Sequence, residues 1–598
     1  MTALQPVARC SPSIYFNETD WAEEAAAARA LDVSDDVLVV GIDFADPAAG
    51  LAEMLDARRR GRTIALLPVF RDPFELWMLK IGASIVTTAD PERRYEQLAA
   101  LRTGTLKVEN HTFEELSAIP QDTKNAIWLG LRLADIVLIG SVTERARWNA
   151  ILGRVIRRFA VLPAAGLNAA AAPKPSPSVT VYAPSTSRVL LGLTELALAD
   201  RGIRAQFITA ENRHEPIRAH VVIVPEWWRA LRVRALSERG HNVIVPDISA
   251  PEELDGRIFS YAQLDVRRLG SALDLAWSMP AQGPRAEISS TLVVAQIEST
   301  RAPQPRPGRI SIVIRTFDRP ALLRRAIASV VRQTHDDVEV VVVNNGGDDI
   351  RSLVEDAVGG RPYRYERSED RRHIGVASNI GARAASGAYV GYLDDDDLLY
   401  PDHCVRAIDA LACSGADLAY TTCVAEYAQI DNGVKTVLGA QIFIDRDFNR
   451  DEIFVGNLAP IHSIVHSRNL FDRYGYFDET LPVTDDWEFW LRATSRNARW
   501  VRVDRATCEY SWRHDPQCGN MTIGYQQQFA DCYEIITKRY AQFTAHRPSL
   551  LASQAASLAA QRNRARMAAD PGNAAQTVMS SMLASAARVG PLIDPIAW

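Results

Sequence analysis

The stretch VGYLDDDDLLYPD, residues 390–402, decides how the C-terminal half of the sequence is interpreted. Its apolar run ends at Leu393, and four consecutive aspartates, Asp394 to Asp397, follow directly before a second apolar pair. Adjacent carboxylates repel one another, and runs of like charge are usually solvated or disordered. A divalent cation such as Mg²⁺ or Mn²⁺ would offset this repulsion, because hard ions prefer carboxylate oxygens. A solvated acidic turn is the alternative.

Two earlier apolar runs also end in polar residues. Residues 310–314 run into RTFDRP at 315–320, and residues 338–343 run into NNGGDD at 344–349. Helices are expected between these runs, over 321–333 and from 373 to 387. In open parallel sheets, ligands bind beyond the carboxyl ends of the strands. The pattern therefore predicts one crevice lined by three strand ends, with solvated turns as the alternative.

The composition is that of a globular protein with several domains. The chain has 598 residues, which is too long for one hydrophobic core, so two to four domains are expected. The formal net charge of -6 gives no general attraction to nucleic acid, and no nucleic-acid partner is expected. The seven cysteines form no CxxC pair, which favours reduced thiols over a disulfide framework or a structural zinc site. With neither a signal peptide nor a transmembrane segment in the pattern, we expect a cytoplasmic protein, compatible with peripheral contact at the inner face of the membrane.

The first 280 residues alternate short apolar strands with amphipathic helical stretches, which predicts α/β units around parallel sheets. Strands are expected at 37–40, 64–67, 136–139, 179–182, 221–224 and 243–245, and a helix at 188–199. An Ala/Pro-rich stretch from Pro163 and the segment RAPQPRPGR at 301–309 read as linkers.

Four motifs in the last 300 residues, in this order, resemble the family 2 glycosyltransferases, which are inverting enzymes of the A-type (GT-A) fold. They are IVIRTFDRPALLRRAIASVVRQT, VVVVNNGGDD, GVASNIGARAASGAYVGYLDDDDLLYPD and VTDDWEFWLRA. The resemblance implies a UDP-, dTDP- or GDP-sugar donor, a Mn²⁺ or Mg²⁺ ion and a single displacement at the anomeric carbon. The acceptor would be a hydroxyl of a glycan, a lipid-linked glycan or a small molecule, in polysaccharide, glycolipid or other glycoconjugate biosynthesis.

The N-terminal half resembles a degenerate form of the two-lobed B-type glycosyltransferases, through the segments ADIVLIGSVTERARW and AHVVIVPEWWRALRVRALSERGHNVIVPD. The expected fold is therefore a multidomain α/β protein, with a Rossmann-like GT-A nucleotide-diphospho-sugar transferase domain after two Rossmann-like α/β lobes. The expected domains are lobes at 1–165 and 176–285, a linker at 286–308, the catalytic domain at 309–545 and a helical tail at 546–598.

The family's DxD motif falls on Asp394-Asp395-Asp396. The resemblance makes Asp396 the expected metal ligand and places Asp394 and Asp395 at ribose and metal contacts. Asp397 would serve the turn and tolerate substitution. Related enzymes often place a basic residue on the metal or the diphosphate at the position of His514, whereas a packing or surface role is the alternative for a lone histidine.

The resemblance also indicates residues that bind the donor. Thr316 and Phe317 match positions that face the base and the ribose, and Gly375 and Asn379 match the helix start that lines the donor pocket. Asn345 stands where an aspartate commonly reads the base. This departure leaves the choice of nucleotide open.

Asp486 corresponds to the catalytic base of the family, and Asp485 to the acid that usually precedes it. An inverting transfer needs one carboxylate near the acceptor hydroxyl, on the face opposite the leaving diphosphate. The alternative is a helix N-cap at Asp485, ahead of Trp487 and Trp490. Both descriptions can hold together.

Two other classes of function remain open. An aspartate-nucleophile phosphohydrolase also carries acidic residues at a strand end, but it expects a small-residue turn where this chain has LLYP at 398–401. A glycan-binding or scaffold protein with an inactive transferase fold is the non-enzymatic alternative.

Overall fold

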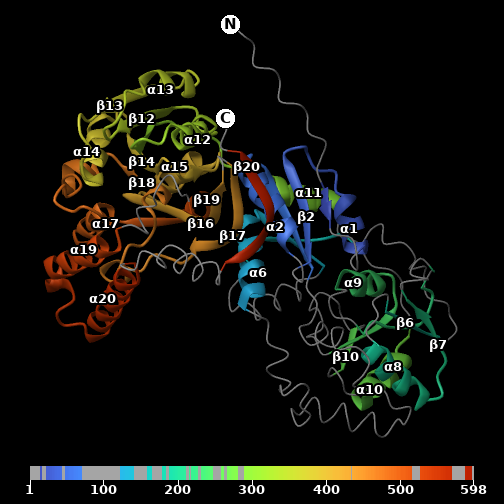
Figure 1. Ribbon diagram of the computed structural model, residues 1–598. Coiled ribbons are helices and arrows are strands. Elements are labelled where there is room, and N and C mark those ends of the chain that lie inside the picture. The colour runs from blue at the N-terminus through green and yellow to red at the C-terminus, as the bar shows by residue number, and fades with distance from the viewer. Residues whose placement is uncertain are drawn as a thin grey trace. The chain divides into compact units, whose positions relative to one another are not determined.

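The protein is described by a computed structural model (Figure 1). The described residues are 14–16, 22–43, 47–69, 121–140, 156, 158–163, 178–183, 188–209, 215, 217–225, 230–246, 258–261, 266–280, 289–431, 434–514, 525–568 and 586–595. The chain divides into two compact units, and each is described by itself. Unit 1 comprises Met1–Gly50, Thr63–Ile127 and Ala134–Thr300, and unit 2 comprises Leu51–Arg62, Trp128–Leu133 and Arg301–Trp598.

Unit 1 contains two separate parallel sheets, in agreement with the alternating sequence pattern. The first has the order β1 (Ile14–Phe16), β2 (Val37–Asp43), β3 (Thr63–Val69), β4 (Ile136–Ile139) and β5 (Phe159–Val161). The second has the order β10 (Ile258–Tyr261), β9 (Asn242–Pro246), β8 (Val221–Ile223), β6 (Val179–Tyr182) and β7 (Ala205–Ile208). The six strands expected in this half are confirmed.

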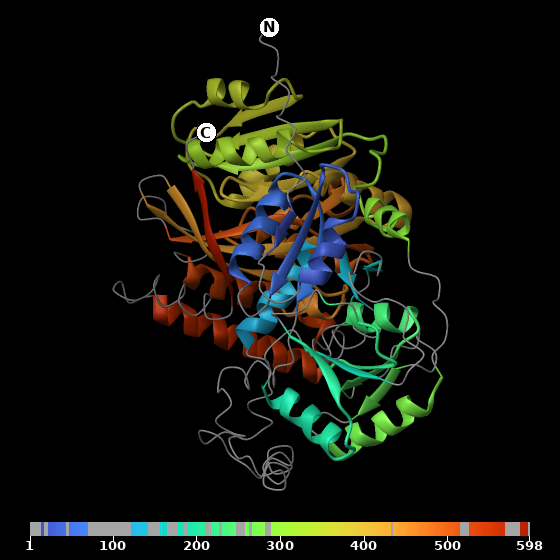
Figure 2. The same ribbon diagram turned by 90° about the vertical axis from the view of Figure 1, so that its right-hand side faces the viewer.

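Helices cover both faces of the second sheet. Figures 1 and 2 show α8 (Arg188–Ala199) and α10 (Val266–Ser278) on one face and α9 (Ala230–Glu238) on the other. Val221 and Ile223 pack with α8 and α10, whereas Val222 and Val224 pack with α9, because successive side chains of a strand point to opposite faces.

Two predicted boundaries need correction. Within the expected linker 286–308, residues Ser290–Glu298 form helix α11, and Val293 and Ile297 are buried in the core of the first sheet. The expected helical tail 546–598 begins with helix α20 (Pro548–Ala568), but Ala587–Pro595 form strand β20, which pairs antiparallel with β17 (Val434–Ile444). Among the described residues, no helix combines the length and apolar composition needed to cross a membrane.

Unit 2 is built on a mixed ten-stranded sheet. Its parallel half has the order β13 (Tyr363–Arg367), β12 (Val338–Asn344), β11 (Ile310–Thr316) and β14 (Tyr389–Asp394). Antiparallel strands β18 (Ile464–Ser467), β16 (Leu418–Asp431), β17 and β20 continue it, and β15 (Leu398–Leu399) and β19 (Trp500–His514) pair beside this path.

Strands β11 and β12 at the centre of the parallel half are buried on both faces, which explains their nearly continuous apolar sequences. Ile312 and Ile314 face a core that includes α12 (Pro320–Val331) and α15 (His403–Ser414). Val313 faces a second core that includes α14 (Ile374–Ala384) and α17 (Asp485–Ser495). The helices expected at 321–333 and 373–387 thus correspond to α12 and α14.

The strand order creates a crevice at the end of β11. The chain passes from β11 outward through β12 and β13, and then returns to place β14 on the other side of β11. This reversal is a topological switch point, where α/β sheets leave room for a ligand beyond the carboxyl ends of the strands. The register places Arg315 of β11 beside Asp394 of β14 at that edge.

Candidate functional site

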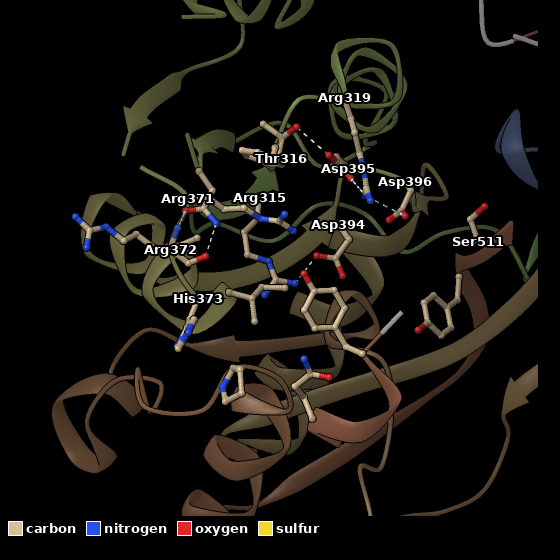
Figure 3. Close-up of a pocket in the computed structure, with 18 residues that line it drawn as sticks. Arg315, Thr316, Arg319, Arg371, Arg372, His373, Asp394, Asp395, Asp396 and Ser511 are labelled. Carbon is tan, nitrogen blue, oxygen red and sulfur yellow. Dashed lines mark hydrogen bonds and ion pairs between the residues drawn. The ribbon is translucent and has the colours of Figure 1, made fainter. Parts of the chain in front are cut away.

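A pocket of about 440 Å³ opens at this switch point (Figure 3). The three strand ends expected to meet do so here, because Thr316, Asn345 and Asp394 all line it. Its lining is strongly charged. Asp394, Asp395 and Asp396 stand opposite the arginines Arg315, Arg319, Arg371 and Arg372.

The first three aspartates of the run are each held by an arginine. Arg315 donates to Asp394 Oδ1, and Arg319 lies 3.1 Å from Asp395 Oδ1. The Thr316 hydroxyl donates to Asp395 Oδ2 at 2.8 Å. Burial and the neighbouring charge of Asp396 raise the pKa of Asp395 to about 7. This carboxyl is therefore partly protonated at neutral pH.

Asp396 remains ionised in this setting. Burial opposes its ionisation, but the charges of Arg513 and Arg319 outweigh burial and lower the pKa of Asp396. Arg513 from β19 donates to Asp396 Oδ2, and Arg319 lies 3.5 Å from the same oxygen. Arg513 is 1% exposed, so the arginine end of the pair is shielded from solvent.

The acidic run fits a hard divalent cation. Both oxygens of Asp395 are engaged, whereas side-chain donors among the described residues reach only Oδ1 of Asp394 and Oδ2 of Asp396. Each of these two carboxylates thus has one oxygen that no described side-chain donor reaches, and Mg²⁺ is commonly bound through one or two carboxylates. His514 is the last residue of β19. Its side chain lies outside the described part of the structure, so its expected contact with the metal or the diphosphate stays a prediction.

The arginines are the site residues that the sequence reasoning missed. The Arg371 guanidinium lies 4.4 Å from the ring centroid of Phe317, in cation–π contact. A signal was present, because Arg371, Arg372 and His373 form a basic run just before α14, and Arg315 directly follows the apolar run of the first strand. A basic run at a strand end and a helix start is typical of an anion site.

Thr316 and Phe317 line the pocket as expected, but three other residues of the expected donor site hold structure around it. Asn345 lines the pocket, yet its amide donates to Arg372 O at 2.9 Å and accepts from Arg372 N at 3.0 Å. Asn379 is 1% exposed and lies outside the lining, because its amide bonds both backbone groups of Phe477.

Gly375 lies behind the pocket wall, at a close approach between α14 and α17. A Cβ atom there would lie 3.2 Å from Asp478 O and 3.2 Å from Asp485 Cβ. Glycine therefore lets Asp485 approach the start of α14.

The acidic pair at the start of α17 faces this junction. Thr484 is the N-cap, with φ of 61°, so Asp485 is the first helical residue and not the cap proposed as an alternative. Asp486 Oδ2 accepts from Asn457 at 2.7 Å, and burial raises the pKa of Asp486. Burial and the charge of Asp486 raise the pKa of Asp485 to about 7. A left-handed non-glycine residue is a strained conformation of the kind that clusters at functional sites.

Arg315 connects the two acidic groups. Its guanidinium binds Asp394 and donates to the Ser378 hydroxyl at 2.9 Å, and that hydroxyl lies 3.4 Å from Asp485 Oδ2. The positive charge of Arg315 lowers the pKa of Asp485 and of Asp486, against the effect of burial. Asp486 itself is not among the residues that line the pocket. The electrostatic link through Arg315 therefore couples it to the acidic run.

Asp397 differs from the expectation that it would tolerate substitution. Its backbone N–H closes the turn to Asp394 O at 3.1 Å, as expected, but its side chain is 1% exposed. Oδ1 accepts from Ser511 N at 2.8 Å, and Oδ2 lies 2.9 Å from His462 Nδ1. A buried carboxylate with two partners makes this residue part of the support beneath the pocket.

Comparison with known proteins shows what this region is similar to. Residues 311–467 match the model of Glycosyl transferase family 2. An uncharacterized glycosyltransferase of Rickettsia typhi is 25% identical over 227 residues, which cover 37% of this chain and 69% of the relative. The glycosyltransferase YwdF of Bacillus subtilis, also uncharacterized, is 29% identical over 200 residues, covering 33% and 72% of the two chains.

Solved structures also align with this chain. The Staphylococcus aureus TarS fragment 1–349 in complex with UDP-GlcNAc has a TM-score of 0.31 and 17% identity, covering 38% of this chain and 65% of its own. The mannosyltransferase PcManGT of Pyrobaculum calidifontis, in complex with GDP-Man and Mn²⁺, has a TM-score of 0.31 and 17% identity, with coverages of 48% and 87%.

Proposed function

We propose that the chain is a metal-dependent, inverting glycosyltransferase that uses nucleotide sugars, because residues 311–467 match the model of Glycosyl transferase family 2. The proposed reaction moves a sugar from a nucleotide-diphosphate-sugar to a hydroxyl of a glycan, a lipid-linked glycan or a small molecule. One observation carries the proposal. A single buried arginine, Arg315, links the acidic run at the end of β14 to the acidic pair at the start of α17.

The pocket lining is suited to a nucleoside diphosphate. Phe317 offers an aromatic face, and the arginines Arg319 and Arg371 supply positive charge for the diphosphate. Base stacking and diphosphate binding would thus come from adjacent parts of one pocket. Asn345 would act by holding the loop at Arg372 and not by reading the base.

The acidic pair would supply the base. Asp486, as carboxylate, would accept the proton of the acceptor hydroxyl while the hydroxyl oxygen attacks the anomeric carbon. The bond from that carbon to the diphosphate oxygen breaks with its electron pair on the leaving group, so one displacement inverts the configuration. A carboxyl with a raised pKa is a stronger base than an ordinary aspartate, which suits this role.

A divalent ion would be held by Asp396, with Asp394 as the second carboxylate. When bound, Mg²⁺ or Mn²⁺ supplies positive charge that stabilises the developing charge of the leaving diphosphate. Arg319 and Arg513 already neutralise part of the acidic run, so they would tune the affinity of that ion.

A thermal-shift panel tests the proposal. UDP, dTDP and GDP are each added to the full-length protein with Mn²⁺ or with EDTA. At about 100 times Kd, a ligand stabilises by about 2.7 kcal/mol, so one nucleotide should raise the midpoint by several degrees with Mn²⁺. Asp396→Asn should remove the Mn²⁺-dependent part. An equal shift in EDTA would contradict metal dependence, and no shift with any nucleotide would favour the glycan-binding alternative.

A further inference from the structure

Three buried side chains outside the pocket meet behind its wall. Cys423 of β16 and Cys508 of β19 are register partners on neighbouring strands, and His462 belongs to the short 3-10 helix Ile461–Ser463. One ligand atom from each residue lies within 4.8 Å of the other two. Both cysteines are fully buried and His462 is 1% exposed. None of the three takes part in the proposed transfer.

The separation of the Cys423 sulfur and the His462 nitrogen matches that of two ligands of a tetrahedral zinc ion. Zinc bonds of about 2.3 Å to sulfur and about 2.0–2.1 Å to nitrogen, at a tetrahedral angle, place S and N about 3.5 Å apart. The observed separation of Cys423 Sγ and His462 Nε2 is 3.5 Å. The nearby third side chain, Cys508, distinguishes this group from a simple packing contact between one thiol and one imidazole.

The two ring nitrogens of His462 have different neighbours, and Nδ1 is in ion-pair contact with Asp397 without hydrogen-bond alignment. His462 Nε2 faces the sulfur atoms, while Nδ1 lies 2.9 Å from the Asp397 carboxylate. Metal-binding histidines commonly donate their other ring N–H to a carboxylate, which fixes the tautomer. Asp397 is itself held by Ser511 N at 2.8 Å. The support for the ring therefore exists without the ion.

We propose that Cys423, His462 and Cys508 bind one zinc ion, with Asp397 as the positioning residue of His462. Two thiolates balance the charge of Zn²⁺, so the loaded site is neutral and suited to burial. Binding releases the two thiol protons to solvent. Thiolate ligands favour zinc over Mg²⁺ or Mn²⁺, which distinguishes this site from the acidic run. The absence of a CxxC pair argued against structural zinc. The proposed ligands give no such local pattern, because neighbouring ligands are 39 or more residues apart in the sequence.

The ion would join three segments beneath the donor pocket. Asp397 directly follows the carboxylates that line the pocket, and the Tyr510 ring, which also lines it, packs on His462 with centroids 5.6 Å apart. Because all three ligands are buried, the ion would enter as the domain folds and leave the folded protein slowly. A metal at the open acidic run would instead exchange rapidly.

Metal analysis of the purified full-length protein tests the site. After gel filtration in reducing buffer with brief EDTA treatment, mass spectrometry of the metals should give close to one zinc per chain. Cys423→Ser and Cys508→Ser should each lower this at least fivefold. Cys404→Ser, at an equally buried cysteine of α15, is the matched control and should retain zinc. Asp396→Asn should also retain it, so failure here and failure of the proposed transfer are distinguishable.

A second measurement avoids variants that fail to fold. Wild-type protein produced with Co²⁺ should show thiolate-to-cobalt charge-transfer absorption in the near ultraviolet and intense tetrahedral bands in the visible. Folded protein with neither zinc nor these bands would overturn the proposal. So would a Cys423–Cys508 disulfide in the reducing buffer, unchanged zinc content in Cys508→Ser, or another metal in the same stoichiometry.

Discussion

Replacing Arg315 by methionine removes the charge that links the two acidic groups while keeping most of the side-chain volume. Arg315 is 7% exposed and Asp485 is 3% exposed, so solvent screens this pair weakly. The Ser378 hydroxyl lies between them, 2.9 Å from the guanidinium and 3.4 Å from the carboxylate. Loss of the arginine therefore acts on Asp485 through a buried path.

The size of the effect follows from this geometry. The two contacts through Ser378 place the nearest charged atoms at most about 6 Å apart, which corresponds to about 3 kcal/mol or more at an effective dielectric constant of about 20. Delocalisation of the guanidinium charge reduces this, and each pKa unit corresponds to about 1.4 kcal/mol, so we expect a rise of about one to two units. The pKa of Asp485 would move from about 7 to a value above 8. Asp486 should shift in the same direction, since Arg315 lowers its pKa too.

The pH dependence of kcat/KM reports this shift. The assay follows release of the nucleoside diphosphate, with the donor that the thermal-shift panel identifies. Because the carboxylate form is required, the acid limb should move to higher pH by one to two units, and kcat/KM at pH 7 should fall by about 10- to 100-fold relative to its own plateau. The measured value belongs to the coupled pair Asp485 and Asp486.

A matched control separates the effect of the Arg315 charge on the acidic pair from the general effect of losing a buried ion pair. Arg492→Met removes the partner of Glu488 in the same helix, and it should lower stability without moving the acid limb. The reasoning fails if Arg315→Met and wild type share the same acid-limb midpoint. It also fails if Arg492→Met shifts the limb as far as Arg315→Met does.

Three further substitutions test the assignments around the pocket. Gly375→Ala should lower stability by about 1–3 kcal/mol and lower the thermal midpoint, because the added Cβ would press on Asp485. Gly456→Ala is the control. It should leave the thermal midpoint unchanged, because nothing lies within 4 Å of its added atom. Asn379→Ala leaves the backbone N–H and C=O of Phe477 without this partner, at a cost of about 1–3 kcal/mol each, so stability should fall while the donor KM stays unchanged. A raised KM at full stability would instead indicate that Asn379 contacts the donor. Asp486→Asn should abolish sugar transfer while keeping the nucleotide-induced thermal shift, and wild-type turnover would exclude it as the base.

Local sequence signals were enough to locate the strands and their polar ends. The β-branched runs at Ile310–Thr316 and Val338–Asn344 are buried on both faces, which is the condition under which such runs form parallel strands. The crevice followed from the same signals, because parallel strands end at one edge. Neither α11 in the expected linker nor β20 in the expected tail could be found in this way. Both are stabilised by partners distant in the sequence, such as the pairing of β20 with β17.

The separate roles of the four aspartates show where local information ends. The sequence by itself determined that four carboxylates follow a buried strand, and that such a group needs compensating charge. Only the tertiary structure decided which carboxylate receives which partner. Arg513, 117 residues from Asp396, keeps that residue ionised beside the pocket, whereas Asp397 is buried in contact with His462. The physical reason is that burial and charge act through space. The partners lie in β19 and in the segment before β18, and no local sequence pattern predicts that they contact the aspartates.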